Sequence, residues 1–324
     1  MIRLGTRGSA LALAQSQQVA DALAHAAGEQ VELITITSEG DVSRASLADF
    51  GGQGVFATRL REALQAGECD VLVHSLKDLP TAPAPGLVVG AIPAREDARD
   101  VAVTRDGTGL HELPAGAVVG TGSPRRIAQL RIRNPRVRWQ DIRGNVDSRL
   151  ARVRSGELDA VILAAAGLAR LGGLPADLAG EALGLAEWPS AAGQGALAIE
   201  IREDAAPALR AAVAALDDEP TRLAVTAERA VLAGLEAGCH APVGIHAQLE
   251  GELLRVRAIA YALDGSARVG TDRTSALIGG YAENPGSGDG ANAVGDADIR
   301  TRAQRTGAGI ARELLARGAA EISQ

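Results

Sequence analysis

The segment VHSLKDLP, residues 73–80, places a lysine and an aspartate side by side, Lys77 and Asp78. Lys77 is the only lysine among the 33 lysine and arginine residues of the chain. A single lysine can be a compositional accident on the surface, or it can have a role that needs a compact ammonium beside a carboxylate, which a planar guanidinium does not replace. Asp78 follows a strand-like run. It is therefore either an ordinary turn residue or a carboxylate that acts as acid, base or stabiliser of a transient cation.

Arginine is concentrated between residues 125 and 154, where ten arginines occur with only two aspartates. Arg125 and Arg126 follow the turn glycine Gly122, and Arg143 precedes Gly144. All three lie at the ends of predicted strands, where α/β sheets usually bind ligands. Because guanidinium groups bind carboxylates and phosphates, these positions predict a ligand with several acidic groups. For six other arginines we expect a solvated helix face: Arg131, Arg133, Arg136, Arg138, Arg152 and Arg154.

Glycine-rich turns lie beside these candidates. GTGSPRR ends a predicted strand and begins a helix, and TRGS places Arg7 and Ser9 before the first predicted helix. Both helix N-termini offer backbone N–H groups to an anionic ligand. The glycines of GGQGVF indicate that residues 41–54 form a mobile lid, and Phe56 either packs over a flat ligand or belongs to the core. The turn SAAGQGA, residues 190–196, is typical of a hinge.

The two cysteines have different settings. Cys69 begins a predicted strand and is expected to be a small buried hydrophobic residue. Cys239 lies in LEAGCHAPVG, in a loop after a predicted helix and beside His240, so it is a candidate nucleophile or covalent anchor. Their wide separation is incompatible with a disulfide framework or a zinc site and fits a reducing cytoplasm. The five histidines lack metal-ligand spacing, and His74, inside a strand, is expected to be a core residue.

Composition excludes several classes of protein. The chain has 324 residues, of which 46% are hydrophobic but only 2% aromatic, so two or three domains with cores of Ala, Val, Leu and Ile are expected. The net charge of −7 argues against nucleic-acid binding as the main purpose. The sequence contains no run of 18 consecutive apolar residues, so no membrane-spanning helix is predicted. The N-terminus, MIRLGTRGSALALA, is only briefly apolar and carries arginines, so we expect a cytoplasmic protein without a signal peptide.

The alternation of strand-like and helix-like segments predicts the domains. Two successive α/β units are followed by a helix at residues 221–238 that ends at a glycine, three antiparallel strands and a closing helix. The strand at residues 196–202 is expected to return to the first sheet. We therefore predict an α/β domain 1 from residues 1–95 and 196–215, an arginine-rich α/β domain 2 from residues 96–195, and an α+β domain 3 from residues 216–324 with a flexible insertion at about 279–297.

Eleven motifs together resemble the hydroxymethylbilane synthase family, also called the porphobilinogen deaminase family. They occur in the family's order and cover essentially the whole chain: TRGSALALAQ, EGD, GGQGVF, HSLKDLP, PAREDARD, GTGSPRR, IRGNVDSRL, LDAVILAAAGLARLG, GQGALAIE, TAERAVLAGLEAGC and PVG. The resemblance implies three domains, the first two similar to type II periplasmic binding proteins. The sequence departs from many members at Gln53 and Asp49, where lysines are common, and at Pro124 and His240.

The resemblance also implies a transferase of tetrapyrrole and haem biosynthesis. It would join four porphobilinogen units head to tail with loss of ammonia and then hydrolyse the product from the enzyme. One dipyrromethane cofactor per chain is implied, bound as a thioether to Cys239. Asp78 would be the catalytic residue, a buried carboxylate that contacts pyrrole N–H groups and stabilises the cation formed as the amine leaves. The partner implied is porphobilinogen, with no nucleic acid or membrane, and the chain is expected to be a monomer.

The family pattern assigns the remaining candidates to the acidic side chains of cofactor and substrate. Cofactor-binding residues would be Ser75, Lys77, Thr121, Ser123, Arg125, Arg126 and Arg143. Substrate-binding residues would be Arg7, Ser9, Phe56, Arg149, Arg170 and Gln194. Two alternatives remain: a non-catalytic two-lobed binding protein for organic polyanions, which leaves Cys239 unexplained, and an anion-sensing regulatory domain, for which no helix-turn-helix segment is evident.

Overall fold

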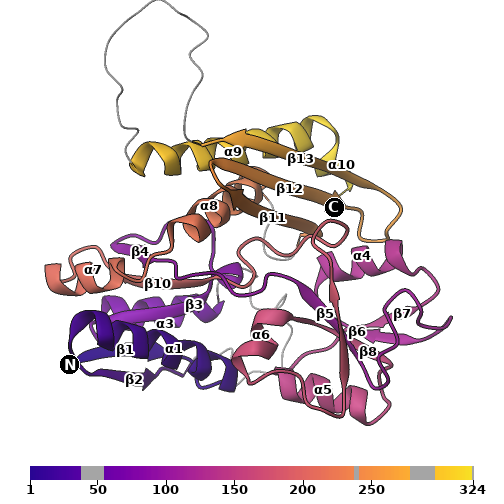
Figure 1. Ribbon diagram of the computed structural model, residues 1–324, viewed down its shortest axis with the longest axis horizontal. Helices are drawn as coiled ribbons and strands as arrows, with labels where there is room; N and C mark the ends of the chain where they lie inside the picture. The colour runs from indigo at the N-terminus through magenta and orange to yellow at the C-terminus, as the bar shows by residue number, and fades with distance from the viewer. Residues whose placement is uncertain (38–54, 237–240, 278–295, 323–324) are drawn as a thin grey trace, which may run out of the picture.

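The computed structural model describes residues 1–37, 55–236, 241–277 and 296–322 (Figure 1). Within these ranges the strands form two five-stranded sheets and one three-stranded sheet. None of the helices in the described ranges is long and apolar enough to cross a membrane.

The first sheet has the strand order β2-β1-β3-β10-β4. Its first three strands are parallel, whereas β10 is antiparallel to β3 and β4. In β3, Val71 and Val73 pack with α1 on one face, and Leu72 packs with α3 on the other, which explains the continuous apolar run of this strand. The elements are β1 (Ile2–Thr6), α1 (Ala10–Ala27), β2 (Val31–Thr35), α3 (Val55–Gln65), β3 (Val71–Ser75), β4 (Leu87–Ala91), β10 (Leu197–Arg202) and α7 (Pro207–Ala214).

The second sheet repeats this topology with the order β7-β6-β8-β5-β9. Strands β7, β6 and β8 are parallel, and β5 is antiparallel to β8 and β9. In each sheet, the antiparallel strand is the first strand that the chain forms after it crosses from the other sheet: β5 follows β4, and β10 follows β9. The elements are β5 (Asp100–Thr104), β6 (Val118–Gly120), α4 (Pro124–Arg133), β7 (Arg138–Gln140), α5 (Val146–Arg154), β8 (Ala160–Ala164), α6 (Ala165–Arg170) and β9 (Ala179–Leu183).

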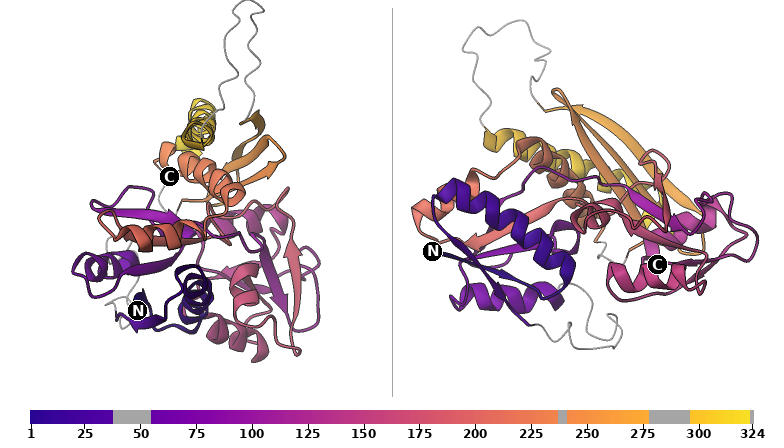
Figure 2. Two further views of the ribbon diagram at one scale, coloured as in Figure 1. Left: turned by 60° about the vertical axis from the view of Figure 1, so that its left-hand side comes forward. Right: turned by 60° about the horizontal axis from the view of Figure 1, so that its bottom comes forward.

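A small antiparallel sheet and its helices complete the fold, and they lie above both larger sheets in the view of Figure 1. Helices α8 and α9 run beside one another next to this sheet (Figure 2). A Cβ at Gly307 would collide with the carbonyl of Ala227, so glycine permits the close approach of α9 to α8. The elements are α8 (Glu219–Gly234), β11 (Val243–Glu250), β12 (Leu253–Tyr261), β13 (Arg268–Ala276), α9 (Asp296–Ala316) and α10 (Ala319–Ile322).

The fold class predicted from the sequence is confirmed: two α/β units of the same topology and a small α+β unit. The expected return of residues 196–202 to the first sheet is also confirmed, because β10 lies between β3 and β4. Strand β9 and helix α7 were not predicted.

Two local predictions need correction. Helix α8 ends at Gly234 rather than at residue 238, and the left-handed residue that follows it is Glu236, with φ of 52°. Its backbone N–H donates to the carbonyl of Ala233, which satisfies one terminal acceptor of the helix without a glycine. The predicted insertion at 279–297 extends too far, because α9 already begins at Asp296. The remainder of that insertion and the predicted lid at 41–54 lie outside the described residues.

Candidate active site

The Lys77–Asp78 pair lies in a short 3-10 helix, η1 (Leu76–Asp78), which follows β3 at the carboxyl end of the first sheet. Leu76 is buried, and its backbone N–H donates to the carbonyl of Ala196 at 3.0 Å. Gly193 packs against the side chain of Leu76 with a positive φ of 73°. The backbone is therefore held at the start of the turn, which determines where the next two side chains emerge.

Asp78 is exposed, which corrects the expectation of a buried carboxylate. Leu76 fills the interior position of the short helix, so the residue two positions later points away from the core. Within the described part of the chain, the carboxylate of Asp78 has neither a hydrogen bond nor an ion pair. A carboxylate that the protein leaves unpaired in this way is accessible to a ligand.

Lys77 is half-buried, and its Nζ donates to Oε1 of Gln194 at 3.4 Å. Burial lowers the pKa of Lys77, and the charges of Arg126 and Arg125 lower it further, while Asp78 and Asp100 oppose the shift. The ammonium is thus electrostatically coupled to both units of the fold. Gln194 is the direct link, because its side chain contacts both Lys77 and Asp100.

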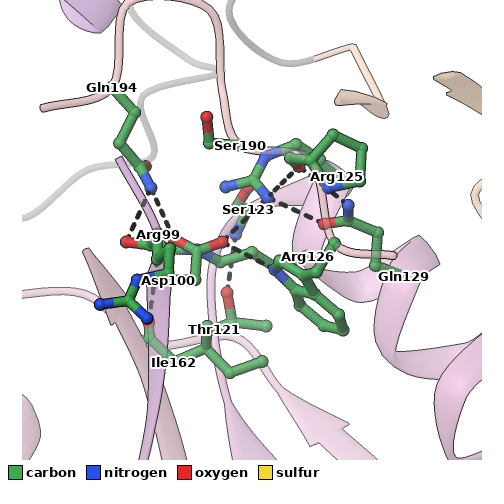
Figure 3. Close-up of polar contacts among 12 residues, drawn as sticks. Arg99, Asp100, Thr121, Ser123, Arg125, Arg126, Gln129, Ile162, Ser190 and Gln194 are labelled. Atoms are coloured by element: carbon green, nitrogen blue, oxygen red, sulfur yellow. Dashed lines mark hydrogen bonds and ion pairs between the residues drawn. The ribbon is translucent and has the colours of Figure 1, made fainter. Parts of the chain in front are cut away.

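Asp100, the first residue of β5, is fully buried and joins the second unit's arginines (Figure 3). Its Oδ2 lies 2.9 Å from Nη1 of Arg125, and its Oδ1 lies 2.6 Å from Nη2 of Arg126. Gln194 Nε2 and Trp188 Nε1 also donate to this carboxylate, at 2.9 and 2.8 Å. Burial disfavours the charged form, but the two guanidinium groups outweigh it and hold the pKa of Asp100 well below its usual range.

Arg125 and Arg126 lie in the first turn of helix α4 and are buried, although each still has an unused donor. Arg125 donates to Gln129 Oε1 at 2.8 Å, and Arg126 donates to the carbonyl of Ile162 at 2.9 Å. The Nε–H groups of Arg125, Arg126 and Arg170 have no hydrogen-bond partner within the described structure. A buried donor without an acceptor costs about 1–3 kcal/mol. These donors fit a group that brings carboxylates to the site, as a dipyrromethane with acetate and propionate side chains does.

Thr121 and Ser123 lie in the turn between β6 and α4. Thr121 is fully buried, and its Oγ1 accepts the backbone N–H of Ser123 at 3.3 Å. Ser123 is the N-cap of α4, but its side chain makes no capping hydrogen bond. The turn therefore presents the positive end of α4 together with two arginines, an arrangement that favours anions.

Two further arginines adjoin this cluster. Arg149, at the start of α5, is half-buried and donates from Nε to the carbonyl of Gly144 at 2.9 Å. Burial and the nearby charge of Arg126 lower the pKa of Arg149, so the two guanidinium groups are electrostatically coupled. Arg170, at the end of α6, donates to the carbonyl of Gly195, the residue after Gln194. Burial also lowers the pKa of Arg170.

Helix α1 contacts the end of β3, the strand that leads into the turn of Lys77 and Asp78. Ser9 is the N-cap of α1, and its hydroxyl accepts the backbone N–H of Ala12 at 3.3 Å. One turn later, Gln15 donates to Oγ of Ser75 at 3.0 Å, which ties α1 to the end of β3. Arg7 precedes Ser9 and is half-buried, whereas Arg143, before α5, is exposed.

The structure thus links four of the predicted residues directly or through Asp100: Lys77, Gln194, Arg125 and Arg126. The hydroxyl of Ser9 caps α1, and no contact between described residues links it to this cluster. Cys239 and the side chain of Phe56 lie outside the described residues. As expected, Cys69 and His74 are core residues.

The burial of Cys69 and His74 explains why neither is a candidate for catalysis. Burial raises the pKa of the Cys69 thiol to about 11, so it is not a ready nucleophile. His74 Nε2 lies 3.2 Å from Oε2 of Glu200, which also accepts hydrogen bonds from Arg61. Burial disfavours the charge on Glu200, but His74 and Arg61 prevail and lower its pKa to about 2.

Sequence reasoning missed the two buried acids that adjoin the candidate site, Asp100 and Glu228. Glu228 accepts two hydrogen bonds from Arg95 and one from the backbone N–H of Gly193. The available signal was the same in both cases: an acid at a position that strand or helix periodicity assigns to the buried face. Such a residue needs a cationic partner, and both acids have arginine partners.

Two family models match the chain. One, described as porphobilinogen deaminase, dipyromethane cofactor binding domain, matches residues 2–210, and the other, described as porphobilinogen deaminase, C-terminal domain, matches residues 222–284. The chain belongs to the porphobilinogen deaminase family. Relatives in this family include a porphobilinogen deaminase of Leifsonia xyli subsp. xyli, 54% identical over 99% of this chain and 94% of the relative. Porphobilinogen deaminase 1 of Streptomyces coelicolor is 50% identical over 99% of this chain and 97% of the relative.

Comparison with solved structures finds more distant similarity. The methionine binding protein MetQ has 16% identity and a TM-score of 0.41, covering 66% of this chain and 89% of that protein. The periplasmic VFT2 domain of Bordetella pertussis BvgS has 16% identity and a TM-score of 0.40, covering 66% of this chain and 85% of that domain. Membership of the porphobilinogen deaminase family rests on the sequence comparisons.

The setting of Lys77 predicts that Lys77→Arg lowers kcat about tenfold, the size expected when one charge-assisted hydrogen bond is lost. The variant keeps the charge, but the planar guanidinium is longer and does not fit the half-buried position opposite Gln194. Steady-state rates with porphobilinogen and the thermal unfolding midpoint measure the effect. Unaltered rates in a normally folded variant would show that activity does not require a lysine at position 77.

Proposed function

We propose that this protein is a transferase that condenses four porphobilinogen molecules head to tail, releases ammonia at each step and then frees hydroxymethylbilane by hydrolysis. Family membership supports the reaction. One observation at the site carries the proposal: the exposed carboxylate of Asp78 has no partner among the described residues and lies next to a lysine that is electrostatically coupled to a buried arginine cluster.

The arginines would bind the acidic side chains of the pyrroles. Each porphobilinogen carries two carboxylates, so a growing chain requires many cationic donors, and guanidinium groups bind carboxylates in a planar, bidentate manner. We assign substrate binding to Arg7, Ser9, Phe56, Arg149, Arg170 and Gln194. The carboxylate of Asp78 would orient a pyrrole N–H and stabilise the positive charge that develops on the ring as the amine leaves.

Binding of a dipyrromethane would supply the pyrrole terminus to which the first substrate is joined. We propose that Cys239 anchors it as a thioether, which keeps the growing chain on the enzyme between additions. The unused Nε–H donors of Arg125 and Arg126 support the presence of an acidic group in this part of the site. The residues that would hold it are Ser75, Lys77, Thr121, Ser123, Arg125, Arg126 and Arg143.

We further propose that residues 1–95 with 196–215, residues 96–195 and residues 216–324 are the three domains. The sheets are compatible with these boundaries, because β10 belongs to the first sheet although it follows the second in the chain. We also propose that the protein is a monomer in the cytoplasm and that porphobilinogen is its small-molecule substrate.

Intact mass spectrometry tests the proposed anchor. The purified chain is expected to exceed its sequence mass by one dipyrromethane and to gain further pyrrole units when porphobilinogen is added. Cys239→Ser should lose the extra mass, whereas Cys69→Ala should retain it because the buried Cys69 thiol has a raised pKa. A wild-type mass equal to that of the bare chain would favour the non-catalytic polyanion-binding alternative.

A further inference from the structure

Arg229, on helix α8 of the third unit, contacts the turn that carries Asp78. Its guanidinium donates to three backbone carbonyls: Nη1 to Leu79 at 2.8 Å and more weakly to Leu76 at 3.4 Å, and Nη2 to Pro80 at 2.6 Å. These acceptors belong to the residues on either side of Asp78. One side chain from a distant part of the sequence therefore spans the whole of this turn.

The turn needs such a restraint because its own hydrogen bonding is sparse. The 3-10 helix η1 has only three residues, and its internal bond runs from the backbone N–H of Leu79 to the carbonyl of Leu76 at 3.2 Å. The carbonyls at a helix end lack intrahelical donors, and Pro80 contributes no N–H. A planar guanidinium offers several N–H donors in one fixed arrangement, which suits adjacent carbonyls better than an ammonium does.

The side chain of Asp78 has no hydrogen bond or ion pair of its own in the described structure, so its position depends on the backbone that carries it. Glu228, the residue before Arg229, accepts the backbone N–H of Gly193 at 2.6 Å. Gly193 packs on Leu76, and its neighbour Gln194 contacts Lys77. Helix α8 therefore contacts the turn through Arg229, and it contacts the segment between β9 and β10 through Glu228.

We propose that Arg229 is a positioning residue for Asp78: it fixes the backbone of residues 76–80 so that the carboxylate is presented in one orientation. This inference rests on the proposed function, because it assumes that Asp78 acts on the substrate. A misplacement of about 1 Å at a reacting group can reduce a rate by about 10²-fold. Loss of the three carbonyl contacts is expected to have an effect of this order on kcat.

The test compares Arg229→Met and Arg229→Lys with Arg222→Met. Arg222 lies two turns earlier on the same face of α8, is half-buried, and donates to Asp217 at 2.6 Å and to the carbonyl of Val89 at 3.5 Å, away from the turn. For each full-length variant, kcat and KM for porphobilinogen are measured, together with hydrogen exchange of the backbone amides of residues 76–79 by mass spectrometry.

Arg229→Met is expected to lower kcat by about 10²-fold with a smaller change in KM, and to accelerate exchange at residues 76–79. Arg229→Lys should recover part of both effects, with a loss of about tenfold in kcat, since an ammonium can serve some of the carbonyls. Arg222→Met should change neither quantity beyond what its stability explains. If Arg229→Met does not fold, the comparison of Arg229→Lys with Arg222→Met decides.

Unchanged kcat or unchanged exchange in a folded Arg229 variant would overturn the inference, as would equal effects in Arg222→Met. A wild-type protein that does not consume porphobilinogen would instead overturn the proposed function. In that case the exchange data, which need no substrate, would still show whether Arg229 restrains the turn.

Discussion

Asp78→Asn is expected to lower kcat for porphobilinogen by about 10³-fold, within the range known for removal of a catalytic acid, base or charge-stabilising group. The amide has nearly the same shape as the carboxylate, but it has no negative charge with which to stabilise a cationic pyrrole. Because Asp78 is exposed and has no protein partner in the described structure, its loss should change the free energy of unfolding by no more than about 0.5 kcal/mol.

A matched control for this measurement is Asp106→Asn. Asp106 is also an exposed aspartate in a turn, but it follows β5 and accepts a hydrogen bond from the backbone of Thr108. Steady-state and single-turnover rates distinguish slower chemistry from slower product release. Wild-type rates in Asp78→Asn would exclude this carboxylate from the reaction, and an equal loss in Asp106→Asn would indicate a general effect of charge.

The largest expected effect on stability is that of Asp100→Asn, which should reduce the free energy of unfolding by about 3–5 kcal/mol. The variant leaves Arg125 and Arg126 buried without their shared counterion, and it replaces an acceptor of hydrogen bonds from Gln194 and Trp188. Urea unfolding at neutral pH measures the loss. Asp97→Asn is the control, because Asp97 pairs with Arg99 at the surface and such pairs contribute about 0–1 kcal/mol.

The difference in free energy of unfolding between wild type and Asp100→Asn should depend on pH in one direction. The pKa of Asp100 is depressed in the folded state, so its contribution is fully present above the unfolded pKa of about 3.9 and is lost as pH falls toward the folded pKa. The stability difference between wild type and Asp100→Asn should therefore be constant near neutrality and shrink below about pH 4. A difference that stays constant or grows in acid would contradict the assignment of a charged Asp100.

Much of the fold could be predicted from local pattern. The apolar run of β3 and the helical spacing of α1 are visible in the sequence, and Pro124 marks the start of α4 as expected. Strand β9, with the sequence AGEAL, was not predicted because its small and polar residues carry no clear period, and its pairing with β5 alone makes it a strand. Helix α7 was missed although Pro207 at its start was a usable signal.

The candidate site, like the fold, could be predicted only in part from the local sequence. Local sequence identified Lys77, Asp78 and the arginines of α4, since residue type and position at a strand end are local properties. The family resemblance predicted a buried Asp78, and nothing in the local sequence indicated that Arg229 would contact the turn, because exposure and carbonyl contacts depend on segments far apart in the chain.

By itself, the sequence determined which side chains are available for chemistry: one lysine beside one aspartate, a group of arginines that suit acidic ligands, and Cys239 in a predicted loop. Only the tertiary structure decided how those charges are distributed. Asp100 neutralises part of the arginine cluster in the interior, while Asp78 is exposed and has no ion pair with any residue that the structure describes. The physical reason is that the free energy of a charge depends on burial and on its neighbours, and both are set by the packing of segments that are distant in sequence.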